Sequence, residues 1–142
     1  MCGFVGILCQ KQKRIKNFKS LVDDLYHRGP DESKIYEDET IQLGFNRLSI
    51  IDKDKGSQPF FSKEKRYAMV YNGEIYNYKE LKSELLANGV RFLTNSDTEV
   101  LLESYIYWGK NFLKKINGMY AFAIYDFKLK KKILVRDRFG IK

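Results

Sequence analysis

A cysteine directly follows the initiator methionine in the opening stretch MCGFVGIL. Removal of Met1 would leave Cys2 with both a thiol and a free α-amino group, whose usual pKa values lie near ~8.5 and ~7.7–8.0. Around neutral pH the unprotonated amine can accept the thiol proton, so the residue would carry its own general base. The position therefore suggests an N-terminal nucleophile. The alternative is a small buried apolar residue, the common role of an isolated cysteine in a strand.

Attack of a thiolate on an amide creates an oxyanion, which backbone N–H groups and side-chain amides can stabilise. The segment YNGE offers both kinds of donor, in the Asn72 side chain and the Gly73 N–H. We expect the preceding strand, YAMV, to end in a tight turn here, because Asn-Gly is typical of such turns. An ordinary turn without a catalytic role is the alternative interpretation.

Two charged residues could hold the charged groups of an amino-acid substrate. Arg47 lies between apolar strands and could bind a carboxylate through two hydrogen bonds, or form an ion pair within the protein. Asp97, in the first turn of a predicted helix, could bind an ammonium group or simply complement the positive end of the helix dipole. The single histidine, His27, allows a Cys–His hydrolase as a further hypothesis.

The chain has 142 residues, of which 44% are hydrophobic and 15% aromatic, a composition that fits one packed domain over residues 1–142. Its apolar runs fall far short of the ~20 residues that cross a bilayer, and its start lacks the positively charged region of a signal peptide. We therefore expect a cytoplasmic location and no membrane partner. Cys2 and Cys9 should stay unpaired, because one strand would hold them roughly 20 Å apart.

The formal net charge is +8, and lysines are concentrated in the segments 11–19 and 128–132. Such a charge allows a nucleic-acid-binding hypothesis, since lysine and arginine release counterions from phosphates. We favour a solvated surface or a face that docks on an acidic partner, because no recognition-helix or RNP-type aromatic pattern accompanies the lysines. The sequence thus predicts no nucleic-acid partner.

Apolar patterns predict several strands, which we place at residues 2–9, 34–38, 40–45, 47–52, 117–127 and 132–137, with another beginning at residue 66. The first strand is expected to be buried, because its apolar run is nearly continuous. The last two strands should form a central hairpin.

Helical spacing predicts three helices. The first, over residues 18–26, should end before the loop HRGPD. The second, over residues 78–89, has Asn77 and Glu80 in the positions of a capping box and Gly89 as its stop. The third follows a further capping box, Ser96 with Glu99, and is apolar on most sides, which predicts burial. Sheets covered by helices in this proportion indicate an α+β protein.

Seven segments occur in one order along the chain: MCGFVGI, HRGPD, RLSIID, YNGEIYN, SDTEV, NGMYAFAIYD and RDRFGIK. Together they closely resemble the N-terminal glutaminase domain of glutamine-hydrolysing asparagine synthetases, a branch of the class II glutamine amidotransferases. The resemblance covers essentially the whole chain. It implies the N-terminal-nucleophile hydrolase fold, an αββα sandwich of two antiparallel sheets flanked by helices. The family continues beyond RDRFGIK, so the last strands of the sandwich are expected to be missing.

The resemblance also assigns roles to residues. Cys2 resembles the family's nucleophile, with its own amine as base, and Asn72 and Gly73 resemble the oxyanion hole. The substrate-binding positions correspond to Arg47, Leu48, Ile50, Ile51, Glu74 and Asp97. The implied reaction converts glutamine and water into glutamate and ammonia through a γ-glutamyl thioester on Cys2, with no metal. One departure is Phe45, where many members of the family have histidine.

In the family, the ammonia passes to an ATP-dependent, Mg-dependent synthetase domain that amidates aspartate, and we expect that domain to be absent from this chain. The resemblance therefore implies no cofactor in this chain, with ATP and Mg confined to the missing domain. The expected partners are glutamine, a synthetase domain or subunit, and a second copy in a homodimer. The alternative is a truncated, non-catalytic remnant that binds glutamine or a partner subunit.

Overall fold

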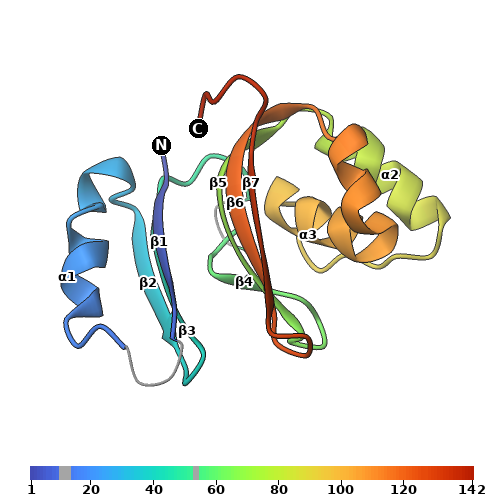
Figure 1. The fold of residues 1–142 in the computed structure, drawn as a ribbon. Helices are drawn as coiled ribbons and strands as arrows, with labels where there is room; N and C mark the ends of the chain where they lie inside the picture. Colours follow the sequence, from blue (N-terminus) through green and yellow to red (C-terminus); the bar gives the residue numbers. More distant parts are fainter. Residues whose placement is uncertain (10–13, 53–54) are drawn as a thin grey trace.

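The computed structural model describes residues 1–9, 14–52 and 55–142. These residues form four layers: helix α1, a three-stranded sheet, a four-stranded sheet, and the helices α2 and α3 (Figure 1). Every strand pairing is antiparallel. The predicted α+β sandwich of two antiparallel sheets flanked by helices is confirmed.

The first sheet has the strand order β1-β3-β2, with bounds β1 (Gly3–Leu8), β3 (Ile41–Arg47) and β2 (Glu32–Glu37). Strand β3 is central and every residue in it is buried. Strand β1 is an edge strand in which only Gly3 is fully buried, so the prediction of a buried first strand is wrong. Its apolar run is nearly continuous, but an edge position leaves one side without a neighbouring strand.

The second sheet has the strand order β4-β5-β6-β7, with bounds β4 (Phe60–Phe61), β5 (Tyr67–Ile75), β6 (Gly118–Asp126) and β7 (Lys131–Arg136). The predicted hairpin is confirmed as β6 and β7, but β7 lies at the edge of the described sheet, so only β6 is central. Strand β4 contains only two residues and covers β5 no further than Met69. The outer edge of β5 is therefore free of a pairing strand from Val70 onward within the described residues.

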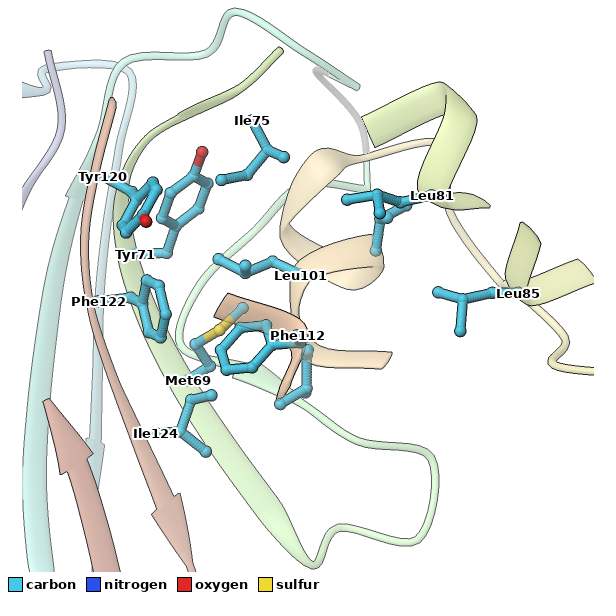
Figure 2. Close-up of a cluster of buried hydrophobic side chains, with 12 residues drawn as sticks. Met69, Tyr71, Ile75, Leu81, Leu85, Leu101, Phe112, Tyr120, Phe122 and Ile124 are labelled. Atoms are coloured by element: carbon cyan, nitrogen blue, oxygen red, sulfur yellow. The ribbon is translucent and has the colours of Figure 1, made fainter. Parts of the chain in front are cut away.

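Helices α2 (Tyr78–Ala87) and α3 (Asp97–Trp108) and the 3₁₀ helix η2 (Gly109–Lys114) cover the outer face of the second sheet (Figure 1). Between them lies the larger hydrophobic cluster. Figure 2 shows Met69, Phe122 and Ile124 of the sheet facing Leu101 and Phe112 of the helical layer. All five side chains are at most 2% exposed. The burial predicted for the third helix is confirmed by its many buried positions.

The smaller cluster lies between the two sheets and has six buried members: Ile41, Leu43, Phe45, Ala68, Val70 and Tyr125. Phe45 is 1% exposed and belongs to this cluster. The residue that departs from the family pattern is thus a packing residue between the sheets, and it does not line the pocket described below.

Helix α1 (Phe18–Asp23) packs on the first sheet through its buried residues Phe18 and Val22. It is shorter than the predicted helix over residues 18–26, and a separate 3₁₀ turn, η1 (Tyr26–Arg28), follows it. The carbonyl of Val22 accepts from the side chain of Asn46 and from the N–H of Leu25. An α-helix would need this carbonyl for the N–H of Tyr26, so the helix ends here.

Two further predictions need correction. The stretch 47–52 is not a strand, because β3 ends at Arg47 and residues 48–52 form a loop. The Arg47 side chain holds this loop against the end of β3, because its Nη2 donates to the carbonyls of Ile51 and Asp52 at 3.2 and 2.7 Å. Asn77 precedes α2 without capping it, because its side chain instead bonds the backbone of residues 115 and 117.

Other local predictions are confirmed. Ser96 caps α3, its Oγ accepting from the Glu99 N–H at 3.2 Å. Gly89 follows α2 with a φ of +86°, the left-handed conformation that glycine allows at a helix end. Cys2 and Cys9 are free cysteines, and the lysines of segment 128–132 are exposed. Part of segment 11–19 lies outside the described residues.

None of the described helices is both long and apolar enough to span a bilayer.

Candidate active site

One pocket brings together all nine residues to which the family resemblance assigns a role: Cys2, Arg47, Leu48, Ile50, Ile51, Asn72, Gly73, Glu74 and Asp97. They come from the start of the chain, the end of β3, the loop after it, the second half of β5 and the start of α3. The pocket lies beside the free edge of β5, past the end of the short strand β4.

Asn72, Gly73 and Glu74 lie within strand β5, so the predicted Asn-Gly turn is wrong. They pair with Ala121, Tyr120 and Met119 of β6 in regular antiparallel register. A Cβ atom at Gly73 would overlap the carbonyl oxygen of Met119. Glycine is needed here for the close approach of two strands, a use that the two-residue motif does not distinguish from a turn.

The backbone N–H of Gly73 faces the pocket, as the pairing of its neighbours establishes. The N–H groups of Tyr71 and Ile75 donate away from β6, to Gln58 Oε1 at 2.6 Å and to Asp97 Oδ2 at 3.2 Å. N–H groups two residues apart in a strand point to the same side. Across the pair, Tyr120 bonds Asp137 on its far side, which agrees with this orientation. Gly73 therefore directs its N–H out of the free edge of β5.

The side chains of β5 divide between its two faces. Tyr71 and Ile75 belong to the cluster under the helices, whereas Val70 belongs to the cluster between the sheets. Because side chains alternate along a strand, Asn72 and Glu74 lie on the face turned towards the first sheet. Both are half-buried, and neither side chain has a hydrogen-bond partner among the described residues. Their polar groups are thus available to a ligand.

Cys2 precedes β1 and approaches the pocket from the first sheet. Its Sγ accepts from the N–H of Leu48 at 3.4 Å and lies 3.5 Å from the carbonyl oxygen of the same residue. The Cys2 carbonyl accepts from Arg28 Nε at 3.2 Å, which holds the start of the chain. Met1 and Lys142 also line the pocket and contact each other through Sδ and Nζ.

Arg47 is 5% exposed and lies at the end of β3. Its Nη1 is 3.8 Å from Glu32 Oε2, and its Nη2 bonds two carbonyls of the loop that lines the pocket. A Cβ atom at Gly56 would overlap Nη2, so this glycine makes room for the guanidinium. The interpretation of Arg47 as part of an ion pair is confirmed, and the residue also lines the pocket, so carboxylate binding stays a prediction.

Asp97 is the first residue of α3 and is 6% exposed. Its Oδ2 accepts from the Tyr71 hydroxyl at 2.8 Å and from the Ile75 N–H at 3.2 Å. Burial raises the pKa of this carboxyl above its usual value, the two hydrogen bonds act in the opposite direction, and the charge of Glu74 adds to the rise. The Asp97 carboxylate is thus buried at the pocket wall, and two hydrogen bonds fix its position.

Several lining residues were not found from the sequence: Met1, Gly56, Gln58, Tyr71, Thr98, Met119 and Lys142. Gln58 is 4% exposed, and its side-chain amide bonds both the N–H and the carbonyl of Tyr71, at 2.6 and 3.1 Å. The Gln58 amide thus makes the two backbone hydrogen bonds to Tyr71 that a longer β4 would otherwise make. The sequence held one signal for Tyr71, which directly precedes Asn72-Gly73 and carries a hydroxyl that must find a partner if buried.

His27 does not belong to the described lining of the pocket. It is exposed in η1, and its Nδ1 lies 3.0 Å from the carbonyl oxygen of Asp24. This placement removes the basis of the Cys–His hydrolase hypothesis. Among the described residues there is also no group of three or more histidine, cysteine or acidic side chains that could hold a metal ion.

Comparisons with known proteins agree with the sequence resemblance. The family model "Glutamine amidotransferase domain" matches residues 1–142. Asparagine synthetase [glutamine-hydrolyzing] 1 of Bacillus subtilis is 43% identical over 100% of this chain and 23% of its own length. Asparagine synthetase B of Escherichia coli is 37% identical over 99% of this chain and 26% of its own. The chain thus spans about a quarter of the length of these relatives.

A solved structure supports the same assignment. Glutamine phosphoribosylpyrophosphate amidotransferase from B. subtilis superposes with a TM-score of 0.58 at 28% identity, over 71% of this chain and 24% of that one. The chain belongs to the glutamine amidotransferase domain family, of the kind carried by glutamine-hydrolysing asparagine synthetases.

Proposed function

We propose that this domain hydrolyses L-glutamine to L-glutamate and ammonia, with Cys2 as the nucleophile. The observation that carries the proposal is that the Cys2 thiol shares one pocket with the Gly73 N–H, which faces out of a free strand edge. The Asn72 amide in the same pocket supplies a second donor for the oxyanion.

The reaction begins when removal of Met1 frees the α-amine of Cys2. This amine takes the Sγ proton, and the thiolate attacks the side-chain amide carbon of glutamine. The Gly73 N–H and the Asn72 amide then stabilise the tetrahedral oxyanion. As the C–N bond breaks, the protonated amine returns the proton to the leaving nitrogen, which departs as ammonia. A water molecule, deprotonated by the same amine, attacks the γ-glutamyl thioester, and glutamate and the Cys2 thiol are released.

The charged groups of the pocket suit the two ends of an amino acid. Arg47 binds the α-carboxylate, because a guanidinium matches a carboxylate in charge and geometry. Asp97, at the start of α3, and Glu74, on β5, bind the α-ammonium group. The loop residues Leu48, Ile50 and Ile51 line the space between these groups and Cys2.

The names and lengths of the relatives support a proposal for the destination of the ammonia. They are glutamine-hydrolysing asparagine synthetases about four times as long as this chain. We propose that ammonia passes to an ATP- and Mg-dependent synthetase domain or subunit that amidates aspartate, in the cytoplasm. Hydrolysis itself needs no cofactor, since the thiol, the amine and the amide donors supply every group it requires. A homodimer of the domain remains part of the proposal.

The test is glutamate release from glutamine by the protein with Met1 removed, as verified by intact mass. Cys2→Ala should lower the rate by roughly 10⁴-fold or more, as loss of a covalent nucleophile does elsewhere. The matched control, His27→Ala, should retain full turnover because His27 lies away from the pocket. Equal rates for the wild type and Cys2→Ala would refute the proposal. Binding of glutamine by the wild type without turnover would favour a non-catalytic binding domain.

A further inference from the structure

The hydroxyl of Tyr71 is a buried polar group that the proposed reaction does not use. Tyr71 is 3% exposed, and its hydroxyl donates to Asp97 Oδ2 at 2.8 Å. The bond joins two separate elements, β5 and α3, at the wall of the pocket. Hydrogen bonds to a charged group are stronger than those between neutral groups, so this contact can determine how the carboxylate is oriented.

Tyr71 is itself held firmly. The Gln58 amide bonds both its N–H and its carbonyl, and its ring belongs to the cluster beneath the helices. Figure 2 shows the ring beside Tyr120, with the hydroxyl pointing away from Met69. The ring also lies against Gly73, because a Cβ atom there would meet its Cε2 at 2.8 Å. A rigid ring of this kind presents its hydroxyl from a defined position.

The charges around Asp97 make its ionised form costly. Burial is the main influence, and the carboxylate of Glu74, on the same strand as Tyr71, acts in the same direction. The other charged or titratable groups that face the pocket are Cys2, Arg47 and Lys142. Of the bonds that oppose the effect of burial, that from the Tyr71 hydroxyl is the largest. Without it, Asp97 would more readily take up a proton and lose its attraction for a cation.

We propose that Tyr71 is a positioning residue, which orients the Asp97 carboxylate towards the α-ammonium group of the amino-acid substrate. The inference rests on the proposed glutamine site and adds to it the residue that sets selectivity for substrates with an α-amino group. Glutaramate, which is glutamine without its α-amino group, is the appropriate probe. Replacement of Tyr71 should weaken the binding of glutamine and leave the binding of glutaramate nearly unchanged.

The test measures the binding of both compounds by calorimetry in a Cys2→Ala background, where no turnover occurs. The parent should bind glutamine more tightly than glutaramate, and Tyr71→Phe should reduce this preference by about tenfold, the value of one hydrogen bond to a charged group. The matched control is Tyr125→Phe, another buried tyrosine, which lies in the cluster between the sheets. This control should keep the preference unchanged. Circular dichroism verifies that each variant is folded.

A second readout is the pH dependence of glutamine binding. Affinity should fall as pH is lowered through the pKa of Asp97, and Tyr71→Phe should move this fall to higher pH because the variant loses a bond that lowers that pKa. An unchanged preference and pH profile in Tyr71→Phe would overturn the inference, and so would a parent that does not distinguish the two compounds. Absence of hydrolysis by the wild type, with the preference behaving as expected, would overturn only the proposed reaction.

Discussion

The two faces of strand β5 differ in a way that separates stability from chemistry. On the face under the helices, Met69, Tyr71 and Ile75 are at most 3% exposed, and the strand ends on a buried side chain although Gly73 is half-buried. On the face towards the first sheet, Val70 is completely buried, but Asn72 and Glu74 are only half-buried and line the pocket. The helix-side face is mostly core, although Tyr71 and Gly73 on it also line the pocket, whereas the other face changes from core to site within three residues.

The comparison teaches that a single strand can be anchored on one side and reactive on the other. The helix-side face fixes the position of the backbone, and the free edge beyond β4 then exposes the Gly73 N–H in a known direction. Preorganised donors of this kind stabilise a developing charge without having to move during the reaction. The following variants test the division, from the largest expected effect to the smallest.

Removal of the amide on the reactive face should affect catalysis almost alone. Asn72→Ala is expected to lower kcat for glutamine hydrolysis by about 10²–10³-fold, the usual loss for one oxyanion donor. Stability should barely change, because the Asn72 side chain has no hydrogen-bond partner among the described residues. Steady-state kinetics and urea unfolding measure the two effects. A large drop in the free energy of unfolding would contradict the proposed division, because it would show that this face of β5 also stabilises the fold at Asn72.

The opposite face should respond in the opposite way. Met69→Ala removes a side chain that is 0% exposed in the cluster under the helices. We expect the free energy of unfolding to fall by about 2–5 kcal/mol, because the lost burial leaves a cavity. Activity per folded molecule should change far less than in Asn72→Ala. Urea unfolding with kinetics on the folded fraction checks this, and a loss of kcat comparable to that of Asn72→Ala would contradict it.

The helical layer that covers this face carries a pH-sensitive residue. Burial, with smaller contributions from the charges of Glu99 and Glu64, raises the pKa of Glu103 on α3 to about 7. The unfolded chain ionises this residue near pH ~4.3, so between that pH and about 7 the folded state binds more protons. Stability should therefore fall as pH rises through this range.

Glu103→Gln provides the measurement, because glutamine does not ionise. Around pH 8 the variant should be more stable than the wild type by roughly 1–2 kcal/mol, a value reduced for partial solvent screening. Near pH 4 the difference should largely disappear. Urea unfolding of both proteins across pH 4–8 gives the two curves, and parallel curves would show that the ionisation of Glu103 does not weaken the helical layer.

The smallest effect is expected at the edge of the same sheet. Leu134 on β7 is 73% exposed, although its residue type and strand position match those of core residues. Leu134→Ala should change the free energy of unfolding by no more than about 0.5 kcal/mol, because little burial is lost. Thermal unfolding beside Met69→Ala tests the contrast. A loss above about 2 kcal/mol would mean that Leu134 is covered in solution, for instance by a second copy of the chain.

Much of the architecture could be predicted from local pattern. The β6–β7 hairpin, the Ser96 cap and the Gly89 stop all depend on residues close together in the sequence. The failures arose where a distant residue competes with local preference. Asn46 takes part in ending α1, and β6 draws Asn72-Gly73 into a strand where the motif alone favoured a turn.

The site shows the same distinction. The sequence by itself determined which groups are present: a thiol beside the chain start, an Asn-Gly pair, an arginine between apolar segments and an acidic residue at a predicted helix start. Only the tertiary structure decided that they meet, that the Gly73 N–H faces away from β6 at an edge that β4 leaves uncovered, and that Gln58 and Tyr71 support the pocket. The reason is physical, because side-chain chemistry belongs to each residue, whereas direction and burial depend on partners far away in the chain.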